Sequence, residues 1–167
     1  HAKPDLGSQE DIARELDGET LLIADARGLL GIAGIMGGAE SEVSEGTSNV
    51  IVESADPKGE RGHTMYHRGS AGSISYAEFR HLGKEGVLGR YSLHYHLCGD
   101  TMRGSSVIGA SIWDSKNRWL TIHGTNYLIA RDNVGYKSVG HGFFLEDGTE
   151  VYNVLDRNLA VGARPAK

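Results

Sequence analysis

Cysteine is nearly absent from this chain of 167 residues, and proline is rare. The one cysteine, Cys98, excludes an internal disulfide framework and leaves the redox compartment open. No run of about 18 apolar residues occurs, which excludes a membrane-spanning helix. Hydrophobic residues make up 39% and charged residues 23%, so the chain as a whole is not disordered. Glycine is abundant, and 24 glycines against 3 prolines indicate a chain that turns often and tightly.

Charge divides the chain into an acidic and a basic part. Residues 1–60 carry 4 Lys/Arg and 13 Asp/Glu, a balance of −9, whereas residues 61–167 carry 13 and 9, a balance of +4. The acidic part should repel nucleic acid, and +4 is modest beside the surface of a nucleic-acid-binding protein. Seven of the eight histidines lie between His63 and His141. This step predicts a boundary between two segments of different origin.

The N-terminal part is expected to combine a short helix with apolar strands. Residues 1–8 are predicted to be a flexible leader, and residues 9–17 a short helix. Apolar runs bounded by turn residues predict strands at 21–24, 29–35 and 49–53.

Two longer stretches in this part carry a resemblance to a known family. LDGETLLIADARG (16–28) and GIAGIMGGAESEVSE (31–45) resemble the editing domain of the bacterial phenylalanyl-tRNA synthetase beta subunit. The resemblance implies a pocket for misactivated tyrosine lined by Ala33 and Gly34, with Glu53 as its acidic contact. The upstream part of that domain, with its pocket histidine, has no counterpart in this sequence. We therefore expect no editing activity from the fragment alone.

From residue 49 onward, short β-rich segments recur at nearly constant spacing. Ile51 precedes Ile74 by 23 residues, whereas Ile74 precedes Val107 by 33. An excursion through residues 82–92 would account for the longer interval. A repeat of this length with glycine at its corners is typical of a parallel β-helix, in which each rung covers the apolar face of the one before.

The spacing therefore predicts a mainly β fold. We expect a right-handed parallel β-helix of about 4–5 rungs over residues 49–167, with a small α+β cap over residues 9–48. Leucine-rich repeats have a similar period, but their Leu-x-x-Leu-x-Leu frame is absent. Asparagine tolerates the left-handed conformation, and we expect the following asparagines to stack at corners: Asn117, Asn126, Asn133, Asn153 and Asn158.

One β-helix segment concentrates residues that could carry chemistry. On a strand, the alternation in His94-Tyr-His-Leu-Cys98 directs two imidazoles and the thiol to one exposed stripe, with Asp100 just beyond. His123 follows Cys98 by 25 residues and Asp147 follows His123 by 24, so we expect all three in one column.

This arrangement suits general acid/base chemistry on a glycan, or a divalent metal held by His94, His96 and His123. Each residue also has a structural interpretation, as a hydrogen-bonded corner histidine, a small buried thiol or a solvated turn. The candidate catalytic residues are His94, His96, Asp100, His123, His141, Glu146 and Asp147. Three arginines could bind an anionic substrate: Arg90, Arg103 and Arg131.

The same part of the chain resembles a second family more strongly. The words RGHTM (61–65), AEFRHLG (77–83), HYHLCGD (94–100), LTIHGT (120–125) and GHGFFLEDG (140–148) look like the β-helix core of the cell-migration-inducing hyaluronan-binding proteins, the transmembrane hyaluronidases and fibrocystin.

This second resemblance implies an extracellular or periplasmic β-helix, with hyaluronan binding or depolymerisation in some members. All seven candidate catalytic residues match its words. Gly142 departs from the pattern, because many relatives have cysteine there, and the family continues for many rungs beyond Lys167. The sequence shows no secretory signal and begins with His1, so we expect a processed product that could have lost a leader.

Three functions remain open at this point. The first is a segment that binds or cleaves an anionic polysaccharide, made inactive if truncation removes part of its groove. The second is a chimera, natural or engineered, without selected activity, in which a synthetase piece caps the β-helix. The third is a tRNA-editing fragment. No membrane partner is expected, and an open rung near Leu159 predicts self-association.

Overall fold

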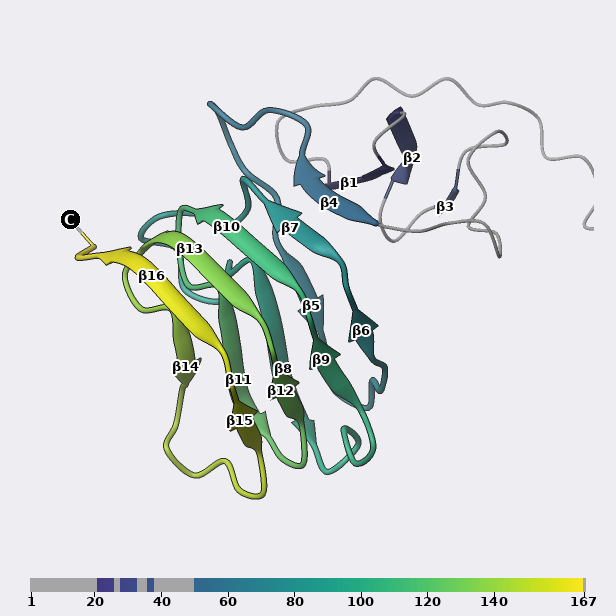
Figure 1. Ribbon diagram of the computed structural model, residues 1–167, viewed down its shortest axis with the longest axis vertical. Helices are drawn as coiled ribbons and strands as arrows, with labels where there is room; N and C mark the ends of the chain where they lie inside the picture. The colour runs from purple at the N-terminus through teal and green to yellow at the C-terminus, as the bar shows by residue number, and fades with distance from the viewer. Residues whose placement is uncertain (1–20, 26–27, 33–35, 38–49, 167) are drawn as a thin grey trace, which may run out of the picture.

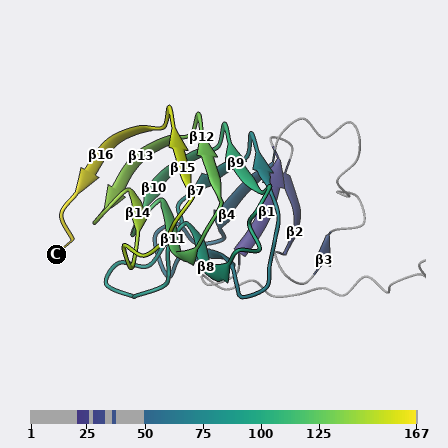
Figure 2. The same cartoon turned by 90° about the horizontal axis from the view of Figure 1, so that it is seen from below.

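The computed structural model describes residues 21–25, 28–32, 36–37 and 50–166. From residue 50 onward the chain coils through three parallel sheets, which confirms the parallel β-helix prediction (Figures 1 and 2). Four rungs each place one strand in every sheet, and a last strand begins a further rung. No helix long and apolar enough to cross a membrane occurs among these residues.

The three sheets run the length of the coil. The first contains, in chain order, β4 (Ile51–Ser54), β7 (Glu78–Arg80), β10 (Ser111–Ser115), β13 (Val134–Val139) and β16 (Leu159–Arg164). The second contains β5 (Thr64–Tyr66), β8 (Leu93–Gly99), β11 (Leu120–Thr125) and β14 (Phe143–Leu145). The third contains β6 (Ile74–Ser75), β9 (Ser106–Ile108), β12 (Ile129–Arg131) and β15 (Val154–Asp156).

Three N-terminal strands extend the first sheet beyond β4. They are β1 (Leu21–Asp25), β2 (Gly28–Ile32) and β3 (Met36–Gly37). β1 pairs antiparallel with β4, and β2 and β3 follow it antiparallel, so a paired strand covers the edge that β4 would otherwise expose. The strand predicted at 21–24 is confirmed. The predicted leader and helix, and the pocket residues Ala33 and Gly34, lie outside the described residues.

The core is built from inward side chains that stack on their counterparts in the next rung. Tyr95 of β8 stacks on Tyr66 of β5, with ring centroids 4.8 Å apart, and pairs in register with Ile122 of β11. Val107 and Ala130 stack in the same way in the third sheet, and both are fully buried. Each rung thus lends its apolar face to the next, as the repeat predicted.

The observed register corrects part of the predicted spacing. Ile74 pairs in register with Val107 on the neighbouring strand of the third sheet. Residues 82–92 form the loop that lengthens the interval between them, as predicted. The predicted match of Ile51 with Ile74 is wrong, because Ile51 pairs with Glu78 and Ile74 belongs to another sheet. Consecutive strands of one rung have similar composition, so a spacing alone does not say which sheet a strand joins.

Gly142 has a packing reason in this chain. The fully buried indole of Trp119 lies over it, and a Cβ at position 142 would come within 2.5 Å of the ring. Gly135 lies under the same indole, with a corresponding distance of 2.3 Å. Trp119 thus fills the space that a cysteine side chain at position 142 would need.

Candidate functional site

The candidate site lies on the outward face of the second sheet. His96 on β8 pairs in register with His123 on β11, and the pairing of Ile122 with Leu145 brings Glu146 level with His123 in the next rung. His94 projects from β8 one pleat away from His96. We call His94, His96, His123 and Glu146 the flank cluster.

The register places Glu146, and not Asp147, in the column of His123. The predicted column was therefore wrong in two steps: His96, and not Cys98, is the counterpart of His123 on β8, and Glu146, one residue before Asp147, is its counterpart in the next rung. Asp147 still contributes from the side, since its Oδ2 lies 3.3 Å from Nε2 of His123.

His94 is buried by the loop of residues 82–92 rather than exposed on a stripe. Its side chain is fully covered, with the ring of Tyr91 4.7 Å away between centroids. Nδ1 lies 3.1 Å from the carbonyl oxygen of Gly89, and because a carbonyl only accepts, Nδ1 carries the proton. Burial lowers the pKa of His94 to about 4, so the ring is neutral at pH 7 and Nε2 presents a lone pair.

His96 and His123 face each other through the same type of ring nitrogen. Their Nδ1 atoms are 2.9 Å apart, so in a hydrogen bond one donates and the other accepts. His67 stacks on His96 from the preceding rung at 5.3 Å. Partial burial and the charges that His123 and His67 would carry lower the pKa of His96, which favours its neutral form.

Glu146 connects the cluster to two residues that the sequence did not single out. Its Oε1 accepts a hydrogen bond from the Tyr91 hydroxyl at 2.9 Å and lies 2.9 Å from Nη1 of Arg118. Burial raises the pKa of Glu146, but the hydrogen bonds from Arg118 and Tyr91 outweigh it, so the pKa is lowered and the carboxylate is ionised. Oε2 points to the imidazoles, 3.5 Å from Nδ1 of His123 and 3.8 Å from Nε2 of His94.

Two atoms of the cluster are buried without a hydrogen-bond partner. They are Nε2 of His94 and Oε2 of Glu146, which face each other. One ligand atom from each of the three histidines lies within 4.8 Å of those of the other two, so these side chains could hold a metal ion. The three histidines that the sequence predicted as metal ligands, His94, His96 and His123, thus lie close together.

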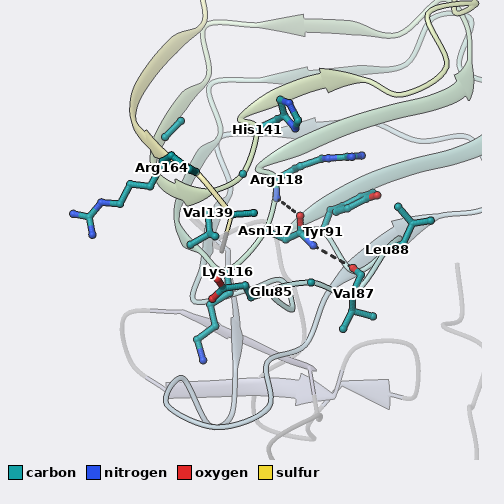
Figure 3. A pocket seen from close by; sticks show the side chains of 15 residues that line it. Glu85, Val87, Leu88, Tyr91, Lys116, Asn117, Arg118, Val139, His141 and Arg164 are labelled. Atoms are coloured by element: carbon teal, nitrogen blue, oxygen red, sulfur yellow. Dashed lines mark hydrogen bonds between the residues drawn. The ribbon is translucent and has the colours of Figure 1, made fainter.

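A cavity of about 610 Å³ is lined by Tyr91 and Arg118, the two residues that contact Glu146 (Figure 3). Its walls include the loop of residues 82–92, the side chains of Tyr91, Arg118 and His141, and residues 163–166. Tyr91 and Arg118 belong to both the cavity wall and the support of Glu146. Arg118 lies over the rings of Tyr91 and Phe144, with its guanidinium carbon 4.5 and 3.9 Å from their centroids.

Tyr91, Arg118 and His141 were within reach of the sequence repeat. Each lies two residues before a paired position, because Leu93 pairs with Leu120 and Leu120 with Phe143. The predicted site kept only His141 of the three. The paired positions are 27 and 23 residues apart, so a single constant period did not bring these three residues together.

Several predicted site residues lie elsewhere. Arg131 on β12 in the third sheet pairs with Asp156 at 3.0 Å. Arg103 lies over the ring of Tyr127 at 3.5 Å, and Arg90 lies 2.8 Å from Nε2 of His63. The structure does not bring these arginines together as one anion site.

Three other predicted residues have structural partners. Asp100 accepts a hydrogen bond from Asn126 at 2.9 Å, outside the cluster. Glu53, the acidic residue of the synthetase-like pocket, pairs with Arg80 across neighbouring strands. His141 packs on the ring of Phe144 at 4.4 Å and reaches the cavity but not the cluster.

Cys98 was wrongly expected on the same face as the histidines. Leu97 adopts a left-handed conformation with φ of 54°, which breaks the strand alternation, and a register shift follows between His123 and Thr125. Cys98 is consequently buried in the core, where burial raises the pKa of its thiol.

The comparisons with known proteins agree with this fold. The family model described as CEMIP beta-helix matches residues 60–167. The chain belongs to this family. Its flank cluster lies wholly within the matched residues. A second model, described as B3/4 domain, matches residues 6–66, the part that resembles a synthetase editing domain.

Curated relatives match part of this chain. The Homo sapiens cell surface hyaluronidase CEMIP2 is 40% identical over 111 residues, which are 62% of this chain and 8% of that protein. Fibrocystin-L of Mus musculus is 47% identical over 90 residues, 54% of this chain and 2% of that protein. The Homo sapiens cell migration-inducing and hyaluronan-binding protein is 37% identical over 107 residues, which are 60% of this chain and 8% of that protein. The chain thus spans less than a tenth of the length of these relatives.

Proposed function

We propose that this protein binds an anionic polysaccharide of the hyaluronan type on the flank formed by the second sheet, and that the flank cluster acts on the bound chain. The observation that carries the proposal is the shared wall: Tyr91 and Arg118 line the cavity and also hold Glu146 of the cluster. A sugar ring in the cavity would therefore lie next to the imidazoles.

The cavity has the chemistry expected for a uronate-containing glycan. Its lining carries Lys116, Arg118 and Arg164 against one carboxylate, Glu85. Tyr91 and Leu88 add apolar surface on which a sugar ring can pack. Positive charge beside an aromatic ring suits a polysaccharide whose sugar units carry carboxylates and also present apolar ring faces.

Relatives named as hyaluronidases and as a hyaluronan-binding protein support the same substrate class. A relative named as a cell surface protein also supports a location outside the cell for this chain. Cleavage would draw on the neutral imidazoles of His94 and His96 and on the ionised Glu146 as proton acceptors.

The test measures binding and cleavage separately. Hyaluronan immobilised on a biosensor reports affinity, and the size distribution of hyaluronan on a gel reports cleavage. We expect the intact chain to bind hyaluronan and not neutral dextran, with affinity falling as salt rises. The His94→Ala/His123→Ala double variant should lose cleavage and keep most binding, whereas Arg118→Gln should weaken both.

The outcomes are distinct. Cleavage lost in the double variant, but kept in the His63→Gln control, would support an active centre at the cluster. Binding without cleavage would limit the function to recognition. A folded chain that does not bind hyaluronan would overturn the proposal and favour a scaffold without selected activity.

A further inference from the structure

We propose that His94, His96, His123 and Glu146 form a binding site for a divalent transition-metal ion, with Zn²⁺ as the expected occupant. The site would use Nε2 of His94, Nδ1 of both other histidines and Oε2 of Glu146. The inference rests on this geometry and does not require the proposed glycan function.

The spacing of the donor atoms fits tetrahedral coordination. Ligand atoms around a tetrahedral zinc with bonds near 2.0–2.1 Å are roughly 3.3 Å apart. The corresponding distances here are 2.9 Å from His96 to His123, 3.5 Å from His123 to Glu146 and 3.8 Å from His94 to Glu146. The three histidine donors all lie within 4.8 Å of one another, so side-chain shifts would bring the four donors to the coordination distance.

In two of the histidines, the ring nitrogen that faces away from the cluster already has a hydrogen-bond acceptor beside it, as in zinc-ligating histidines. Nδ1 of His94 donates to the carbonyl of Gly89, which leaves Nε2 unprotonated. Nε2 of His123 lies 3.3 Å from Asp147, which holds the proton on that side and leaves Nδ1 to face the cluster. Both unprotonated nitrogens therefore point to the common centre.

The buried atoms without partners point to the same conclusion. An unsatisfied buried polar atom costs about 1–3 kcal/mol, so two that face each other need an explanation. Nε2 of His94 is such an atom, on a side chain with no exposed surface, and Oε2 of Glu146 is the other. Two acceptors cannot satisfy each other, whereas a cation between them would satisfy both.

The donor set selects the type of ion. Calcium and magnesium prefer oxygen ligands, and three imidazoles with one carboxylate suit zinc and its neighbours. Tyr91 and Arg118 hold the other oxygen of Glu146 and so orient the carboxylate toward the ion. Asp147 acts as a positioning residue through His123.

The test uses the full chain without a histidine tag and the metal alone. Equilibrium dialysis measures Zn²⁺ stoichiometry, and the visible absorption of bound Co²⁺ reports tetrahedral coordination. We expect one equivalent per chain and a tetrahedral Co²⁺ spectrum. His123→Ala and His94→Gln should weaken binding by more than about 100-fold, and Asp147→Asn by about 10- to 100-fold.

His63→Gln serves as the matched control for incidental binding to a histidine outside the cluster, and circular dichroism checks that each variant folds. Equal zinc binding by His123→Ala and the intact chain, or no binding by the intact chain, would overturn the proposal. Hyaluronan binding without zinc binding would reject the metal site and leave the proposed function standing. Zinc binding without hyaluronan binding would do the reverse.

Discussion

Two groups of buried polar side chains follow the repeat of this β-helix, and they differ in whether their hydrogen bonds are complete. At the corners, Asn133 receives a hydrogen bond from Ala110 N and donates to Val107 O and Asn158, at 2.8–3.0 Å. Asn153 bridges Leu128 N and Thr125 O in the same manner. On the flank, Nε2 of His94 and Oε2 of Glu146 have no partner.

The difference separates a structural group from a binding group. We call Asn133, Asn153 and Asn158 the asparagine ladder: their amides join neighbouring rungs and leave nothing for a ligand. The same repeat places the flank cluster, but there Nε2 of His94 and Oε2 of Glu146 face each other without forming a hydrogen bond. A periodic polar residue therefore indicates function only when its hydrogen bonds remain open.

Removing a residue of the asparagine ladder should have the largest effect on stability. Asn133→Ala leaves the buried Ala110 N–H without its side-chain acceptor and removes the bonds to Val107 O and Asn158, and we expect a loss of about 3 kcal/mol in the free energy of unfolding. Urea unfolding followed by circular dichroism measures it. Asn126→Ala is the matched control, because its bonds to Asp100 and Val151 are exposed, and it should cost under about 1 kcal/mol. Equal losses would contradict the special role of the buried amide.

Neutralising the carboxylate of the cluster should have an intermediate effect. Glu146→Gln keeps an oxygen for Tyr91 but removes the charge that pairs with the mostly buried Arg118. We expect a loss of about 1–2 kcal/mol in metal-free buffer, measured by the same unfolding experiment with a chelator present. A loss as large as that of Asn133→Ala would make Glu146 a structural residue of the same kind.

Replacing a histidine of the cluster should have the smallest effect in the absence of metal. His96→Gln loses one half-buried contact with His123, and we expect the free energy of unfolding to change by less than about 1 kcal/mol with chelator present. If this variant instead fails to fold without metal, the imidazoles serve the fold and the contrast with the asparagine ladder disappears.

The sequence predicted the architecture well because the repeat is a packing requirement. Every rung must be covered by the next, so spacing and glycine content were enough to predict a parallel β-helix with a loop at 82–92. The column assignments were harder. His96 lies level with His123 because Leu93 pairs with Leu120, whereas the left-handed Leu97 turns Cys98 toward the core, and neither follows from a spacing alone.

The corner asparagines show the same limit. Their stacking was predicted, and Asn133 and Asn158 do bond to each other. The left-handed conformation was assigned to the wrong residue, because Asp132 and Arg157, directly before these asparagines, have the positive φ angles. The asparagines instead use their amides to hold the backbone of neighbouring rungs, a pattern that no single-residue preference reveals.

Likewise, the sequence did not show that the three arginines predicted to bind substrate lie outside the cavity lining. Arg131 lies in the third sheet and Arg118 beside the second, although both are close to histidine in the sequence. Arg118 and Tyr91 could have been found from the offsets that relate β8, β11 and β14. Those offsets differ from rung to rung, so a single constant period misses them.

The most direct test of the account is the change in unfolding free energy on addition of zinc. At a free Zn²⁺ concentration 100 times the dissociation constant, the intact chain should gain about 2.7 kcal/mol. Asn133→Ala should start from a lower stability and gain the same amount, whereas His96→Gln should gain far less. An intact chain that gains nothing, or a His96→Gln variant that gains as much, would contradict the distinction between a completed ladder and an open cluster.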